Sequence, residues 1–129
     1  MPKKKKITPN PSGSQLHAQR ISELMLDKKA LDIKIIKVDK LTTLTDYFIN
    51  CSSESDPQTR AIKNHIHSTL SSEYNLKPLH IEGYENLQWI LMDYATIVIN
   101  IFNKETRAYY DIERLWADAD IKTIKTEVK

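Results

Sequence analysis

The chain has 129 residues and a formal net charge of +2, from 19 basic and 17 acidic side chains. This length predicts one domain, and a hydrophobic content of 40% is enough for a buried core. No apolar run approaches the roughly 20 residues that span a bilayer, and no secretory or transit signal is recognisable at the start. A single cysteine, Cys51, excludes an internal disulfide and is typical of a reducing compartment. We therefore expect a cytoplasmic protein.

The basic residues are unevenly distributed along the chain. Four of the 19 form the run Lys3, Lys4, Lys5 and Lys6, so the remainder has 15 basic against 17 acidic residues, a net charge of −2. That remainder is a poor candidate for binding nucleic acid through bulk charge. Residues 1–13 predict a disordered basic leader. Its lysines could make a minor contact with ribosomal RNA, and the alternative is a solvated arm that only favours solubility.

The first half of the chain alternates helix and strand patterns. Residues 14–29 have an apolar stripe at helical spacing, and residues 32–38 and 47–52 read as strands whose mutual pairing the pattern leaves open. Asp56 followed by Pro57 predicts a helix start. The apolar positions of that second helix recur every four residues, at Ile62, Ile66 and Leu70.

The second half is dominated by a predicted hairpin. After a short strand over residues 79–83, the runs 88–93 and 96–102 are separated by a short polar break, which favours two adjacent strands. Trp89 and Leu91 point to one face of the sheet, and the alternate residues point to the other. A strand that is apolar on both faces needs cover on both, from the protein's own helices or from a partner.

The remaining pattern completes the predicted architecture. Residues 104–119 read as one or two short helical turns with an apolar face, and residues 120–129 read as a frayed tail. That apolar face comprises Tyr109, Ile112, Leu115 and Trp116. The predicted order is helix–strand–strand–helix–strand–strand–strand–helix. We expect an α/β fold with a mixed five-stranded sheet flanked by helices, in one domain over residues 14–119.

Motifs that would carry enzyme chemistry are scarce. The sequence has no glycine-rich phosphate loop and no Cys–His metal spacing, so no cofactor, metal or catalytic residue is predicted. Asp46, Glu82 and Asp93 could hold a magnesium ion if they converged, as in a small nucleotidyltransferase-like enzyme. Nothing in their spacing shows convergence, and this enzyme is kept as the alternative function. Cys51 has no local base, so a buried thiol is the better interpretation.

Aromatic residues concentrate near the C-terminal end. One group of five, half of the ten aromatic residues, falls within a stretch of fewer than 30 residues and comprises Trp89, Tyr94, Tyr109, Tyr110 and Trp116. Interfaces favour aromatic anchors, but the same rings could simply fill the core. Arg107, Glu113 and Arg114 could likewise form an ordinary solvated helix face.

Several motifs together resemble one family. They are Thr45-Asp46-Tyr47-Phe48-Ile49, Glu82-Gly83, Trp89-Ile90-Leu91-Met92-Asp93-Tyr94, Thr106-Arg107 and Tyr110-Asp111-Ile112-Glu113-Arg114-Leu115-Trp116. In this order they resemble the ribosomal silencing factor family, also called iojap-like proteins, over residues 14–118. The resemblance implies a nucleotidyltransferase-like shape without catalytic residues. It also implies a translation repressor that binds the large ribosomal subunit at its fourteenth ribosomal protein, blocks association with the small subunit when nutrients are scarce, and can form homodimers.

The resemblance also implies which residues meet the partner. The positions that match the family's characteristic residues are Trp89, Leu91, Asp93, Asp46, Tyr110 and Glu113. The chain departs from the family pattern at Ser53, Pro57, Ala95 and Asn100, where glycine, arginine, glycine and histidine are usual. We expect one side of the hairpin, around the Trp89 indole, to be left uncovered by the protein's own helices.

Overall fold

The computed structural model describes residues 11–125, with side chains from residue 13. The helical elements are α1 (Pro11–Asp27), α2 (Asp56–Tyr74), α3 (Lys104–Tyr110) and a 3₁₀ turn, η1 (Ile112–Trp116). The strands are β1 (Leu31–Lys37), β2 (Tyr47–Ser53), β3 (His80–Glu82), β4 (Trp89–Asp93), β5 (Ile97–Asn103) and β6 (Asp120–Ile124). Residues 1–10 of the predicted leader, which include Lys3 to Lys6, lie outside the described residues, as does the end of the predicted tail, residues 126–129.

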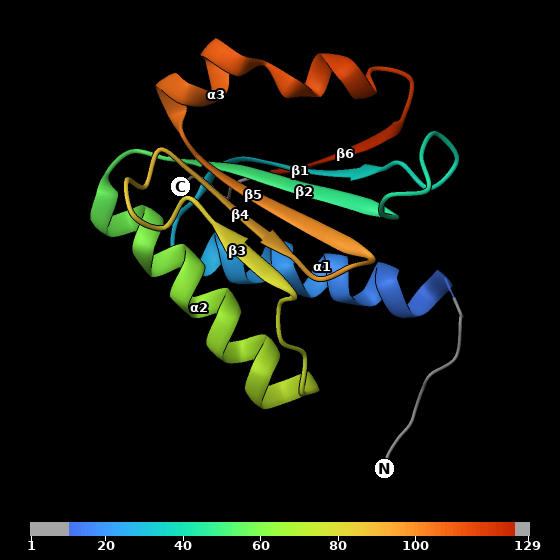
Figure 1. The fold of residues 1–129 in the computed structure, drawn as a ribbon, viewed down its shortest axis with the longest axis horizontal. Coiled ribbons are helices and arrows are strands. Elements are labelled where there is room, and N and C mark those ends of the chain that lie inside the picture. Colours follow the sequence, from blue (N-terminus) through green and yellow to red (C-terminus); the bar gives the residue numbers. More distant parts are fainter. Residues whose placement is uncertain (1–10, 126–129) are drawn as a thin grey trace.

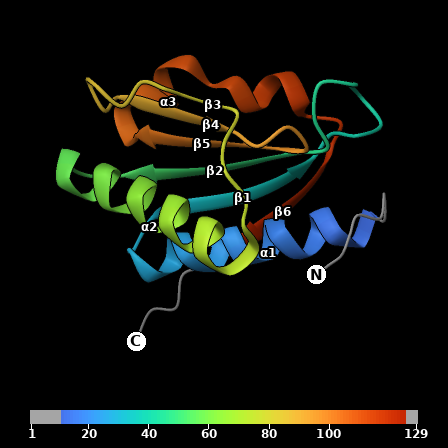
Figure 2. The ribbon, with the colours of Figure 1, turned by 60° about the horizontal axis from the view of Figure 1, so that its bottom comes forward.

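The strands form one mixed sheet in the order β3-β4-β5-β2-β1-β6 (Figure 1). β2 and β5 pair in parallel, and the other neighbouring strands pair antiparallel. The pairing of the first two strands, which the sequence left open, is therefore antiparallel. Helices α1 and α2 lie against one face, and α3 with η1 lies on the other (Figures 1 and 2). The predicted α/β fold with a mixed sheet and flanking helices is confirmed.

The strand count was wrong by one. Strand β6 occupies residues that were predicted to fray, and it pairs with β1 from Lys37↔Asp120 to Ile33↔Ile124. Its side chains are almost all exposed, so it has no hydrophobic period that a sequence pattern could show. Backbone hydrogen bonds to β1, rather than side-chain burial, define it. Helix α1 also begins at Pro11, three residues earlier than predicted.

The main core lies between the sheet and the α1–α2 layer. In β4, Ile90 and Met92 are 0% exposed, whereas Trp89 and Leu91 are half-buried on the opposite face. This alternation matches the predicted hairpin, and β4 and β5 do pair antiparallel. Cys51 is buried in the same core, and burial raises the pKa of its thiol to about 12, as expected for an inert thiol.

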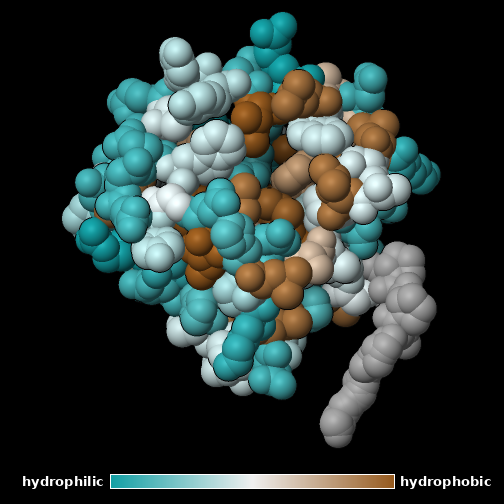
Figure 3. All heavy atoms as spheres, viewed as in Figure 1, coloured by the Kyte–Doolittle hydropathy of each residue, from teal (hydrophilic) through white to brown (hydrophobic). Residues whose placement is uncertain are grey.

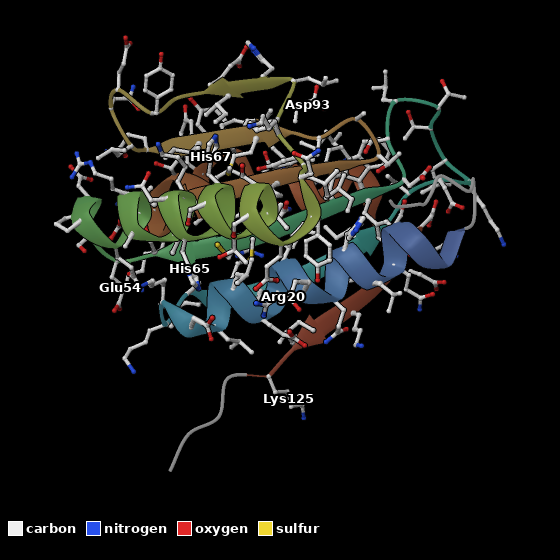
Figure 4. The ribbon with its side chains drawn as sticks, turned by 90° about the horizontal axis from the view of Figure 1, so that it is seen from below. Arg20, Glu54, His65, His67, Asp93 and Lys125 are labelled. Carbon is white, nitrogen blue, oxygen red and sulfur yellow. The ribbon has the colours of Figure 1, made fainter. Side chains whose placement is uncertain are left out.

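Capping residues define the ends of helix α2, and side-chain contacts with α1 hold the two helices together. Helix α2 begins at Asp56, where the sequence predicts a helix start, and its N-cap is Ser55, whose hydroxyl accepts from the Gln58 backbone N–H at 3.2 Å. It ends at Asn75, which adopts the left-handed conformation. Arg20 of α1 lies between the two helices, and its guanidinium contacts the Glu73 carboxylate at 3.0 and 3.2 Å (Figure 4).

The structure shows the local conformation and contacts of two residues that depart from the family pattern. Ala95 sits in the β4–β5 turn at φ +74°, a conformation that glycine adopts with less strain. The turn is held by the Asp93 carboxylate, which accepts from the Ala95 N–H at 2.8 Å. Ser53 is buried at the end of β2, where its hydroxyl bonds that of Thr59 in α2.

Candidate interaction surface

The sheet face beneath α3 and η1 carries half-exposed apolar side chains. The sheet register places these side chains together. Phe48 on β2 is the cross-strand partner of Val98 on β5, and Val98 is in turn the partner of Asp93 on β4. Leu91 on β4 is the partner of Asn100 on β5. We call this surface the Trp89 face. It consists of Phe48, Trp89, Leu91 and Val98 on the sheet with Tyr110 and Trp116 on the C-terminal segment. In the view of Figure 1, hydrophobic side chains appear as separate patches in the upper part and the middle of the molecule, with hydrophilic side chains between them (Figure 3).

The C-terminal segment covers part of this face. The Trp89 ring lies 4.9 Å from Phe102 and 5.3 Å from Tyr110, centroid to centroid. Tyr110 itself is 55% exposed. The expectation that the protein's own helices leave the Trp89 side uncovered therefore needs correction: α3 and η1 lie over it, and the indole is half-buried. Because Trp89 supports Tyr110, removing the indole would also cost stability.

A chain of hydrogen bonds runs beneath these rings from strand to strand. The Trp89 indole N–H donates to Asn100 Oδ1 at 2.9 Å, and Asn100 Nδ2 donates to Asn50 Oδ1 at 3.0 Å. Asn50 Nδ2 in turn donates to Glu113 Oε2 at 3.0 Å. The chain links β4, β5 and β2 to η1. Asn100, one of the departures from the family pattern, therefore fixes the orientation of the Trp89 ring.

Arg107 completes this network from α3. Its Nη2 lies 2.6 Å from Glu113 Oε2, and its Nη1 donates to the Asp32 carbonyl at 2.7 Å and to Ser52 Oγ at 2.9 Å. Its side chain is 10% exposed and that of Glu113 is 17% exposed. For these two residues the idea of an ordinary solvated helix face is wrong. They anchor α3 and η1 to the sheet, so Glu113 positions the surface rather than presenting its own carboxylate to a partner.

The Glu113 carboxylate predicts a dependence of stability on pH. Burial alone raises the pKa of Glu113, but hydrogen bonds from Asn50 and Arg107 with the Arg107 charge outweigh it, so the net pKa is lowered. A lowered pKa in the folded state contributes stability above the unfolded value of about 4.3, and this contribution is lost as pH falls through the folded value. The difference in unfolding free energy between wild type and Glu113→Gln should therefore narrow between about pH 5 and pH 3.

Urea unfolding of both proteins across that range measures this difference directly. Other carboxylates titrate in both proteins, so the difference isolates Glu113. If the difference in unfolding free energy between wild type and Glu113→Gln stays constant down to pH 3, the pKa of Glu113 is not lowered in the folded protein.

The three carboxylates of the alternative enzyme do not form a metal cluster. Within residues 13–125 no group of three or more His, Cys, Asp or Glu side chains could hold a metal ion. Asp93 holds the β4–β5 turn, and the Glu82 carboxylate pairs with His80 at 2.6 Å. Asp46 is half-buried just before β2, where its backbone N–H donates to the Thr96 carbonyl at 3.0 Å. The convergence that this enzyme required is absent.

The predicted apolar face of the C-terminal segment also needs correction. Tyr109 and Leu115 are 82% and 75% exposed, while Ile112 and Trp116 are half-buried. The reason is Asp111, which ends α3 at φ +48° and turns the chain before η1. The helical spacing that joined the four residues into one face does not continue through this break.

Sequence reasoning missed the network that holds the surface. Asn50 and Asn100 are 1% and 2% exposed in strands that are otherwise apolar. A buried amide needs hydrogen-bond partners, so two asparagines inside buried strands are a usable signal. Arg107 offered no comparable signal, because its partners include a backbone carbonyl 75 residues away in the sequence. No helix among residues 11–125 has the length and apolar character needed to cross a membrane.

Comparison with known proteins by sequence identifies one family, and comparison by structure finds the same fold. The family model described as "Ribosomal silencing factor during starvation" matches residues 11–129. A ribosomal silencing factor of Bacillus subtilis is 34% identical over 95 residues, which is 74% of this chain and 80% of the relative. A mouse protein named for mitochondrial assembly of the ribosomal large subunit is 29% identical over 119 residues, 86% of this chain and 51% of that protein.

A solved structure agrees with these matches. A crystal structure of a Chromobacterium violaceum protein superposes with a TM-score of 0.76 at 29% identity, over 89% of this chain and 92% of that one. The family model spans the sheet, the helices and the Trp89 face alike. This chain therefore belongs to the ribosomal silencing factor family.

Proposed function

We propose that this protein binds the large ribosomal subunit at its fourteenth ribosomal protein and so blocks association with the small subunit. In this role it represses translation under nutrient limitation, in the cytoplasm and without catalysing a reaction. Family membership supports the ribosomal role, and the mouse relative is named for ribosomal large-subunit assembly. The observation that carries the proposal is the half-exposed Trp89 face, on which aromatic and aliphatic side chains remain partly open to a partner.

The face has the composition of a binding site. Trp89 and Leu91 on β4 with Tyr110 on α3 supply the apolar centre, and the buried network beneath them fixes their positions before a partner arrives. Half-buried Asp93, on the same sheet face, supplies negative charge for the rim. Asp46 lies at the same end of the strands. Acidic groups around an apolar centre suit a basic ribosomal protein.

The test compares two single variants, in each of which one leucine on one side of the sheet is replaced by glutamine. Leu91→Gln removes apolar contact from the Trp89 face and should weaken docking on isolated large subunits by about tenfold, which is about 1.4 kcal/mol. Leu16→Gln is the matched control, because Leu16 is 69% exposed on α1, on the other side of the sheet. Co-sedimentation through sucrose gradients measures binding, and adding small subunits measures the block of subunit joining.

The two variants distinguish weaker docking caused by a change in the Trp89 face from weaker docking caused by losing any exposed apolar side chain. If Leu91→Gln pellets with large subunits like wild type, the Trp89 face is not the docking surface. Equal losses in both variants would also contradict the proposal. Urea unfolding of each variant first establishes that both are folded.

Two minor contacts belong to the same proposal. The run Lys3 to Lys6 would touch ribosomal RNA and so steepen the salt dependence of co-sedimentation, which should flatten when residues 1–10 are deleted.

The protein would also form a homodimer, which light scattering over a concentration series measures. A monomer mass at all concentrations would remove the dimer from the proposal.

A further inference from the structure

A hollow of about 300 Å³ lies on the sheet face opposite the Trp89 face, where the first half of α1 passes over β1, β2 and β6. Its volume is at the lower end of the range for small-molecule sites. The residues that line it are Gln15, Ala18, Gln19, Ile35, Lys37, Tyr47, Asp120, Ile121 and Lys122. The proposed docking on the ribosome uses none of them.

Strand register explains why charged groups gather there. Lys37 is the cross-strand partner of Tyr47 on one side and of Asp120 on the other. Lys122 is the partner of Ile35 and lies two residues from Asp120, so its side chain shares their face. Three adjacent strand ends therefore bring two ammonium groups, one carboxylate and one phenol to a single site.

The polar groups are held in place and include an available cation. Lys122 Nζ donates to Gln19 Oε1 at 3.3 Å, which ties β6 to α1 across the hollow. Lys37 is half-buried, and within residues 13–125 no carboxylate lies within salt-bridge distance of its ammonium. Tyr47 is 7% exposed, and burial raises the pKa of its phenol, which keeps it a neutral hydrogen-bond donor.

The apolar part of the lining gives the hollow a second property. Ala18 on α1 and Ile35 on β1 give the lining an apolar part beside its polar residues. A ligand that fits both parts has an anionic group for the lysines and an organic body for the apolar part. Hydroxyl groups on that body would donate to the Asp120 carboxylate and would pair with the Gln15 amide.

We propose that this hollow binds a small phosphate monoester with an organic body, of the size of a sugar phosphate or a mononucleotide. The phosphate lies between Lys37 and Lys122, and the body lies along α1 against Ala18 and Ile35. Counted over the residues that line the hollow, two ammonium groups and one carboxylate give a net charge of +1.

The experiment uses the full chain labelled with ¹⁵N and two probes, adenosine monophosphate and ribose 5-phosphate. Saturable shifts of the backbone amides of Ala18, Ile35 and Lys122 are expected with at least one probe. Lys37→Gln should weaken that binding at least fivefold. Lys34→Gln is the matched control, because it removes the same charge from the same strand on the opposite face of the sheet.

Each outcome decides the proposal. Binding that survives in Lys34→Gln and falls in Lys37→Gln supports it. The absence of saturable shifts with both probes overturns it, as do equal losses in the two variants, which would indicate bulk charge. Lys122→Gln serves as the second test if Lys37→Gln does not fold, because Lys122 is exposed. Unfolding curves for every variant separate loss of a ligand contact from loss of the fold.

Discussion

Replacing Arg107 by methionine should lower the free energy of unfolding by about 3 kcal/mol, the usual loss when one partner of a buried ion pair is removed. Methionine keeps much of the side-chain volume but donates no hydrogen bond. It would leave the Glu113 carboxylate without its cation and the Asp32 carbonyl and Ser52 hydroxyl without their shared donor. Urea unfolding at pH 7 measures the loss.

Arg114 provides the matched control for Arg107. Its side chain is 83% exposed, and it lies 3.7 Å from Asp111 in a surface pair that contributes little. Arg114→Met should change stability by less than about 0.5 kcal/mol. A double variant with methionine at both Arg107 and Glu113 should recover part of the loss, because no buried charge is then left unpaired. Equal effects at Arg107 and Arg114 would contradict the anchoring role.

Arg107 also connects stability to the proposed function. It holds α3 against the sheet, and α3 carries Tyr110, which contacts the Trp89 ring. The apolar residues that would meet a ribosomal protein are thus kept in place by a charge that the partner never touches. Preorganisation of this kind reduces the entropic cost of binding. For this reason, loss of Arg107 should weaken docking even though its own side chain is buried.

The central strands could be predicted from sequence because they are short apolar runs rich in β-branched residues. The residue types of β4 are apolar on both faces, so they predicted the strand but not its exposure; the structure buries Ile90 and Met92 and leaves Trp89 and Leu91 half-exposed. Strand β6 could not be predicted in this way. It is held by backbone pairing with β1 at the sheet edge, and exposed edge residues carry no apolar signal.

The site was predictable only in part, because its geometry depends on distant contacts. The aromatic residues left two interpretations open, interface anchors or core filling, and the structure brings the rings of Trp89 and Tyr110 to 5.3 Å on a half-exposed face. The prediction that Leu115 shares one helical face with Tyr109 and Trp116 failed at Asp111, where one left-handed residue changes the direction of the chain. Periodicity is a local property, and it cannot detect a single residue that interrupts it.

Gly83 has a backbone requirement that its motif alone does not explain. Its φ is +84°, and a Cβ added there would lie 1.9 Å from the Trp89 carbonyl oxygen. Its own carbonyl accepts from the Leu87 N–H at 3.1 Å, so the loop between β3 and β4 folds back closely on the start of β4. The resemblance to the family through Glu82-Gly83 thus has a physical cause, because only glycine fits beside the backbone of Trp89.

Gly83→Ala should therefore lower the free energy of unfolding by about 3 kcal/mol, since it combines backbone strain with a collision that only backbone movement can relieve. Gly13→Ala is the control within the same chain. Nothing lies within 4 Å of an added Cβ at Gly13, and alanine is the better helix former, so stability should stay equal or rise by up to about 1 kcal/mol. Urea unfolding of the pair measures both changes. A loss below 1 kcal/mol at Gly83 would mean that the β3–β4 loop can move away from Trp89 freely, which would contradict a preorganised Trp89 face.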